Sequence, residues 1–116
     1  MDELTDYRGT DFYCDVALRR VGDLDVVAET DQVLAFRHTR PYWRDHVVVI
    51  PRTHLASLIT VTEADEPILR DLFAVVRRVA AELTADRGAA RVLTNLGEYQ
   101  DSKHLHVHVA SGPVLD

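Results

Sequence analysis

Cysteine is almost absent from this sequence of 116 residues, and with Cys14 alone the chain can form no internal disulfide. No apolar run approaches the ~20 residues of a membrane-spanning helix. The opening residues MDELTDYRG lack the basic region and the apolar stretch of a secretory signal. Basic residues are outnumbered, 13 against 19 acidic ones, and the net charge of −6 has the wrong sign for a broad nucleic-acid-binding face. These absences predict a cytoplasmic protein that binds neither membranes nor nucleic acids.

The composition is that of one ordinary globular domain. Hydrophobic residues make up 47% of the chain and charged residues 28%, which is typical of a folded domain rather than a disordered or fibrous chain. No internal repeat, low-complexity block or linker interrupts the sequence. We therefore expect a single domain over residues 1–116.

Short segments rich in branched apolar residues predict about five strands. Pro51 closes the third of them, because proline cannot donate a hydrogen bond to a neighbouring strand. Turn residues between the first two strands indicate a hairpin. The expected strands cover residues 25–29, 32–37, 46–50, 91–96 and 104–110.

Apolar residues at spacings of three and four predict one long helix between Thr62 and Gly88. Thr62 and Asp65 resemble a capping box, and Gly88 is a typical helix terminator. The predicted apolar stripe includes Phe73 beside Leu72 and Val76. A shorter helical segment is expected over residues 15–20. The fold class is therefore α+β, an antiparallel sheet of about five strands with the long helix, and the short N-terminal helix, on one face.

The last predicted strand alternates histidine with apolar residues. His104, His106 and His108 point to one face, and the intervening leucine and valines point to the other. Neighbouring histidines have Cα atoms about 6.5 Å apart, so two rings can share one small anionic group. A solvated sheet face that happens to carry imidazoles is one alternative. A metal site completed by His46, His38 or Cys14 is another.

The segment 104–110, reading HLHVHVA, resembles the motif of the histidine triad nucleotide-binding family. The resemblance extends over residues 26–112 and is specific, because several short motifs agree at independent spacings. It includes the strand VLAF at residues 33–36, then Pro41, the segment HVVVIPRTH at residues 46–54, and Asn95, Gly97 and Gln100.

The resemblance implies a covalent mechanism and a role for each site residue. In the family the middle histidine, here His106, attacks the α-phosphorus of a nucleotide, and water then hydrolyses the nucleotidyl-histidine. A neutral imidazole of ordinary pKa is a competent nucleophile for this step, and a backbone carbonyl is expected to hold its other nitrogen. His108 would contact the phosphate and protonate the leaving group. The resemblance assigns supporting relay roles to His104 and His46, and phosphate or leaving-group contacts to Asn95 and Gln100.

The chain departs from the family pattern at three places. His38 stands where many relatives bind ribose with an acidic residue, and it is our candidate for a substrate contact there. Ser102 follows Asp101, whereas many relatives have the phosphate-binding serine at position 101, and we expect Ser102 to bind phosphate. Asp11 replaces the first cysteine of a zinc-binding pair that ends here at Cys14, so we predict no metal. His54 is interpreted as a turn-capping residue.

The sequence thus predicts an enzyme that needs no cofactor and cleaves a phosphorus bond to a nucleoside monophosphate. The short chain is most similar to the phosphoramidase-type branch, which acts on purine nucleoside phosphoramidates. Cleavage of dinucleoside polyphosphates or an adenylyl sulfate is one alternative, and a nucleotide-binding or metal-sensing module without turnover is another. The resemblance also implies a homodimer, which would protect an edge strand.

Overall fold

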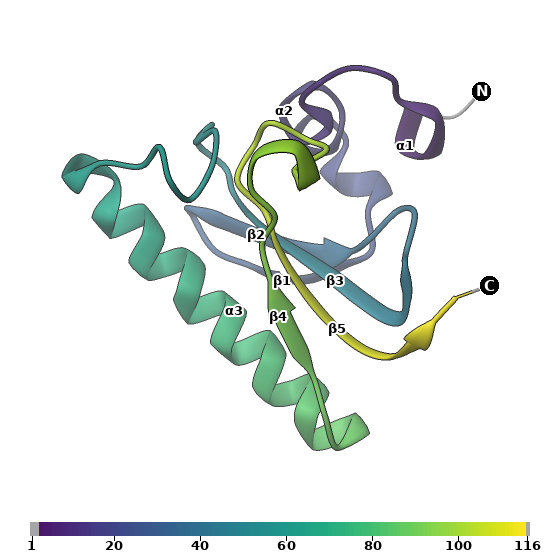
Figure 1. Cartoon of the computed structure of the whole chain (residues 1–116). Helices are drawn as coiled ribbons and strands as arrows, with labels where there is room; N and C mark the ends of the chain where they lie inside the picture. Colours follow the sequence, from purple (N-terminus) through teal and green to yellow (C-terminus); the bar gives the residue numbers. More distant parts are fainter. Residues whose placement is uncertain (1–2, 116) are drawn as a thin grey trace.

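One antiparallel sheet organises the chain. The computed structural model describes residues 3–115, and within this range five strands follow the spatial order β1-β2-β3-β5-β4 (Figure 1). The hairpin β1-β2 was expected from the sequence. The strands are β1 (Val26–Glu29), β2 (Val33–Arg37), β3 (Trp43–Pro51), β4 (Arg91–Leu93) and β5 (Val107–Val114).

The central pair of strands sets the register of the histidines. In the antiparallel pairing of β3 with β5, His46 lies opposite Ala110, and Val48 lies opposite His108. The prediction that the last strand begins at His104 is wrong, because β5 begins at Val107. The preceding residues leave the ladder, and the backbone N–H of Leu105 donates instead to the carbonyl of Leu55 at 2.6 Å.

The long helix forms as the sequence predicts. Helix α3 (Glu66–Arg87) follows the short 3-10 helix η3 (Glu63–Asp65), and a capping box between Thr62 and Asp65 closes the start. Gly88 ends α3 with a φ of 84°, a left-handed conformation that glycine adopts readily. The sequence signals at both ends of this helix are therefore confirmed.

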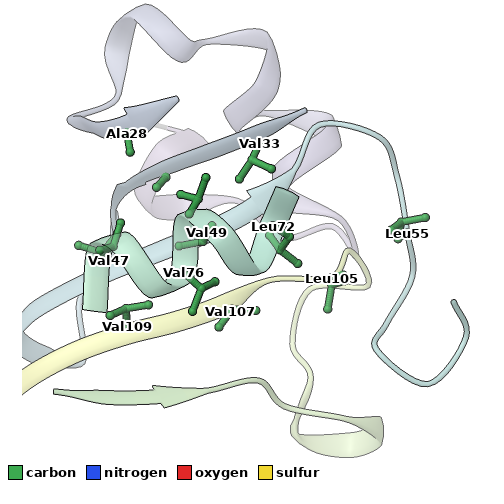
Figure 2. Packing of buried hydrophobic residues seen from close by; sticks show 13 residues of the cluster. Ala28, Val33, Val47, Val49, Leu55, Leu72, Val76, Leu105, Val107 and Val109 are labelled. Atoms are coloured by element: carbon green, nitrogen blue, oxygen red, sulfur yellow. The ribbon is translucent and has the colours of Figure 1, made fainter. Parts of the chain in front are cut away.

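Helix α3 covers one face of the sheet. Its buried residues are Leu72, Val75, Val76 and Val79, which pack against β-strand residues such as Val47 and Val109 (Figure 2). Phe73, expected in this stripe, is 39% exposed. A straight helix touches a sheet along a narrow stripe, and successive residues are turned about 100° apart, so Phe73 falls outside it.

The N-terminal segment covers the opposite face, in contrast to the prediction that its short helix shares the face of α3. Strands β2 and β3 are apolar on both faces, because Leu34, Phe36, Val48 and Ile50 point away from α3. These side chains need their own cover. It is supplied by residues 12–24, while α1 precedes them (Figure 1). The short helices are α1 (Glu3–Asp6), α2 (Phe12–Asp15), η1 (Ala17–Arg19) and η2 (Val21–Asp23).

Two further observations concern the helices. A short 3-10 helix, η4 (Gly97–Tyr99), interrupts the connection between β4 and β5, where the sequence predicts a longer strand and a polar loop. Among the described helices, none has both the length and the apolar character needed to cross a membrane.

Candidate active site

Four histidines lie buried where β3, β5 and the segment before β5 meet. His46, His104, His106 and His108 are each at most 8% exposed. The rings of His106 and His108 meet edge to face, with centroids 5.0 Å apart. The ring of His104, in contrast, turns toward the N-terminal segment. The structure therefore divides the predicted triad between two clusters of side chains.

His106 presents one bare nitrogen. Its Nδ1 lies 2.7 Å from the carbonyl oxygen of His104. Because a carbonyl only accepts hydrogen bonds, Nδ1 carries the proton and Nε2 keeps its lone pair. Burial lowers the pKa of His106, although its bond to the His104 carbonyl opposes that shift. His106 is thus a neutral imidazole with a free nucleophilic nitrogen.

His46 and His108 form a hydrogen-bonded chain with defined tautomers. The backbone N–H of Tyr42 donates to Nδ1 of His46 at 2.9 Å, so the proton of His46 is on Nε2. That nitrogen lies 2.8 Å from Nδ1 of His108. His108 must then carry its own proton on Nε2. Burial, and then the nearby ionisable ring of His106, lowers the pKa of His46 to about 4 and that of His108 to about 3.

His38 stacks on this chain from the loop after β2. Its ring lies 4.4 Å from that of His46, centroid to centroid. The backbone N–H of Arg40 donates to Nδ1 of His38 at 3.0 Å, which leaves an N–H donor on Nε2. Burial, and then His46, lowers its pKa to about 3. At neutral pH this position offers a hydrogen-bond donor in place of a carboxylate.

Two adjoining cavities open onto these rings. One of about 110 Å³ reaches His106, Tyr13 and Ser102, and one of about 710 Å³ reaches His46 and Trp43. The larger volume lies in the range of small-molecule sites. Both cavities are lined by His38, Arg40, Asn95, Asp101 and His108.

The polar residues predicted from the sequence have different surroundings. Asn95 lines both cavities, and Ser102 lines the smaller one. Asp101 and Ser102 line the same cavity, so the carboxylate of Asp101 does not keep Ser102 out of the site. Gln100 is buried, and its amide donates to the carbonyls of Ala56 and Ser102 at 2.7 and 2.9 Å. That amide nitrogen holds the loop together.

Sequence reasoning missed several residues of the cavity walls, among them Arg40 and Tyr13. Arg40 is a charged group in both linings, and only its position two residues after His38 could have suggested it. Tyr13 packs under His106 with ring centroids 4.9 Å apart, and burial raises its pKa. Tyr13 reaches the site from α2, so local sequence carries no signal for this contact.

The second cluster surrounds His104. The Nε2 of this ring lies 2.9 Å from the carbonyl oxygen of Pro51. Its Nδ1 lies 3.3 Å from Sγ of Cys14 and 3.3 Å from Nδ1 of His54. Both ring nitrogens therefore have partners outside the chain formed by His46 and His108. The donor atoms of this cluster could hold a metal ion, as could those of His38, His46 and His108.

The chain resembles known proteins in both sequence and fold. The model of the HIT domain matches residues 19–113. This chain belongs to the HIT domain family. Over 99 residues it is 33% identical to an uncharacterized HIT-like protein of Synechococcus elongatus, covering 84% of this chain and 87% of that relative.

Solved structures of HIT proteins share the fold. A histidine triad protein from Clostridium difficile is 31% identical with a TM-score of 0.75, covering 96% of this chain and 97% of that one. A HIT family hydrolase from Clostridium thermocellum is 28% identical with a TM-score of 0.76, covering 91% and 93%. The α+β prediction and the family resemblance are thus confirmed.

Proposed function

We propose that this HIT protein is a nucleotide hydrolase or transferase that cleaves a phosphorus bond to a nucleoside monophosphate through a covalent adduct on His106. The observation that carries the proposal is the bare Nε2 of His106, which lies beside the N–H donor of His108 in a shared cavity. The Clostridium thermocellum relative is described as a hydrolase, which supports the reaction class. We expect purine nucleoside phosphoramidates as substrates.

The first half of the reaction forms a bond from Nε2 of His106 to the α-phosphorus and breaks the bond from phosphorus to the leaving nitrogen. The bonding electron pair moves to that nitrogen, which takes a proton from solvent and leaves as the amine, while the Nε2–H of His108 donates a hydrogen bond at the reacting centre. The His106 ring, 5.0 Å from that of His108, gains a positive charge in this step, which the negative phosphate offsets. Water then attacks the phosphorus, gives its proton to solvent and releases His106 as a neutral imidazole.

Substrate contacts follow from the cavity lining. Asn95 and Ser102 can donate to phosphoryl oxygens, and Arg40 supplies positive charge in the same cavities that Asp101 lines. His38 offers its Nε2–H to a sugar hydroxyl. Gln100 acts through the loop that it holds. No step of this chemistry requires a cofactor.

The decisive experiment compares the wild type with His106→Asn, on adenosine and guanosine 5′-phosphoramidates that carry a fluorescent amine. We expect amine release by the wild type, at least about 10³-fold slower release by the variant, and a nucleotidyl adduct on His106 by mass spectrometry. Equal release by a folded variant would contradict the mechanism. No release by either would favour dinucleoside polyphosphates, an adenylyl sulfate or a binding role, each tested with the same pair of proteins.

A homodimer belongs to the same proposal. The sheet order leaves β4 at an edge, with Val92 49% exposed. Pairing β4 with a second copy would satisfy this edge. Gel filtration at micromolar concentration should give twice the chain mass of 13.1 kDa, and elution at 13.1 kDa would contradict the dimer. We also place the protein in the cytoplasm, consistent with its single cysteine.

A further inference from the structure

The second half of the proposed reaction, hydrolysis of the His106 adduct, needs a group that takes a proton from water. The water that attacks the phosphorus must lose a proton, and an acceptor held next to it speeds such a step about 10²- to 10⁴-fold. That acceptor must line the cavities and must have a free lone pair. At neutral pH, imidazole nitrogens and carboxylates are the side-chain groups suited to this task.

Of the imidazoles in residues 3–115 that line the two cavities, none has a free lone pair in the adduct. Nε2 of His106 is then bonded to phosphorus, and its Nδ1 donates to a backbone carbonyl. Nδ1 of His108 accepts from Nε2 of His46. Nδ1 of His46 and Nδ1 of His38 each accept a backbone N–H. The histidines of the site are therefore unable to take the proton without giving up a hydrogen bond.

Asp101 is the one carboxylate among the described residues that line these cavities. It lines both of them, as His108 and Asn95 do, and so lies where the two cavities adjoin. Within residues 3–115, its carboxylate makes no hydrogen bond and no ion pair. Both of its oxygens therefore keep lone pairs for a water molecule at the reacting centre.

The negative charge of Asp101 acts on the nucleophile. Burial lowers the pKa of His106, and the charge of Asp101 is among the causes that oppose this shift. Burial raises the pKa of Tyr13, whose ring packs against His106, and the charges of Asp11 and Asp101 raise it further. Asp101 therefore stabilises positive charge on His106, and that ring is positive in the adduct.

The charge of the phosphoryl group decides in which half-reaction a carboxylate is useful beside it. A phosphoramidate carries one negative charge, which Asp101 repels. In the adduct, the positive His106 ring balances that charge, so the group facing Asp101 is neutral overall. Arg40, which lines both cavities, offsets the repulsion while substrate binds. Asp101 is thus suited to hydrolysis of the adduct rather than to its formation.

Neighbouring residues hold the backbone of Asp101 in place. The side-chain amide of Gln100 donates to the Ser102 carbonyl at 2.9 Å. The backbone N–H of Lys103 donates to the carbonyl of Thr10 at 2.6 Å. Because the chain is anchored on both sides of Asp101, its exposed side chain starts from a fixed position at the cavity.

We propose that Asp101 is the general base that activates water against the His106 adduct, an inference that rests on the proposed function. The water oxygen forms a bond to phosphorus while the bond from phosphorus to Nε2 of His106 breaks, and the electron pair of that bond returns to Nε2. One proton of the water passes to the Asp101 carboxylate and from there to solvent. The other hydrogen stays on the phosphate, and His106 is again a neutral imidazole.

The test separates the two half-reactions with Asp101→Asn, whose amide cannot take the proton. Wild type and variant are mixed with the fluorescent adenosine 5′-phosphoramidate and quenched at successive times. We expect first-turnover release of the amine at nearly the wild-type rate, and decay of the adduct on His106 slowed about 10²-fold. The variant should therefore show a burst of about one amine per chain, while mass spectra show the nucleotidyl adduct accumulating.

Two further variants distinguish a proton acceptor from a residue that only shapes the loop. In Asp101→Ala, added formate can fill the space of the missing carboxylate and should speed adduct decay several-fold, with the first turnover unchanged. Glu98→Gln removes another exposed carboxylate of the same loop, outside both linings, and should behave as the wild type. Circular dichroism checks that all three variants are folded.

The outcomes separate this inference from the function on which it rests. Adduct decay at the wild-type rate in folded Asp101→Asn, or equal slowing of both half-reactions, would overturn the role of Asp101 and leave the His106 mechanism standing. Formate that leaves Asp101→Ala unchanged, or an equal loss in Glu98→Gln, would also overturn it. No amine release by the wild type would instead overturn the proposed function, and the role of Asp101 with it.

Discussion

Backbone groups decide which nitrogen of His38, His46 and His106 carries the proton. The N–H of Tyr42 fixes His46, the N–H of Arg40 fixes His38, and the carbonyl of His104 fixes His106. Since a backbone group cannot change its donor or acceptor character, the tautomers hold without any charged partner. The site is thus built from neutral rings, and a change in the partner of a ring tests whether that partner fixes the tautomer.

A prediction at this scale concerns His46. Replacing it with alanine removes the Nε2–H that fixes His108, so kcat should fall about 10- to 100-fold, less than the loss of the nucleophile His106, with KM nearly unchanged. Glutamine, which can place an N–H near the same point, should restore part of the rate. Steady-state kinetics on the phosphoramidate substrate measure this. A variant that raises KM at constant kcat would contradict the positioning role.

At the scale of elements, α3 shows how local signals place a helix. Its capping box, the proline in its first turn and Gly88 at its end all act within a few residues of the positions that they determine. The ends of the strands depend more on contacts with distant residues. The start of β5 was predicted three residues too early, because the contact of Leu105 with Leu55 competes with the ladder. Helix ends are therefore better predicted here than strand ends.

A prediction at this scale tests the helix end. Gly88→Ala should lower the free energy of unfolding by about 1 kcal/mol, because alanine disfavours a positive φ. An added Cβ at Gly88 would meet no atom within 4 Å, so the cost is purely conformational. Gly22→Ala is the matched control, because its Cβ also meets open space without a positive φ. Urea unfolding of both variants gives the comparison, and equal stabilities would refute the conformational cost.

At the scale of the whole molecule, the sheet buries a group of imidazoles in their neutral form. Burial is the main cause of the lowered pKa of His38, His46 and His108. Below about pH 6.5 the histidines of the unfolded chain bind protons, whereas the same histidines in the native chain stay neutral because their pKa values are lower. Acidification must therefore favour the unfolded state.

This linkage gives a prediction with a definite sign. As pH falls from about 6.5 toward the lowered value of about 4 for His46, the free energy of unfolding should fall, and it should be constant above about 7. His46 and His108 would each contribute about 2 kcal/mol between pH 7.5 and pH 5. Thermal midpoints measured in chelator should drop by at least about 5 °C over this interval. A flat profile would contradict the buried neutral state, and His108→Asn should show a smaller drop.

Much of the molecule was predictable because its signals are local. Alternation at residues 104–109 separates the histidines from Leu105, Val107 and Val109, and the structure keeps this separation. The same pattern singled out His106 and His108, whose rings do meet in the site. It also grouped His104 with them, since spacing along a strand cannot show where a buried ring finds its partners.

The sequence by itself determined the strands, the long helix, its two ends and the face on which the histidines lie, because each depends on residues within a few positions of one another. Only the tertiary structure decided that the N-terminal segment covers the face opposite α3 and that His104 joins Asp11, Cys14 and His54. Cys14 contacts His54 and His104, which lie 40 and 90 positions away in the chain. The N-terminal segment covers its face because both faces of β2 and β3 are apolar and must be buried, a requirement that no local sequence pattern expresses.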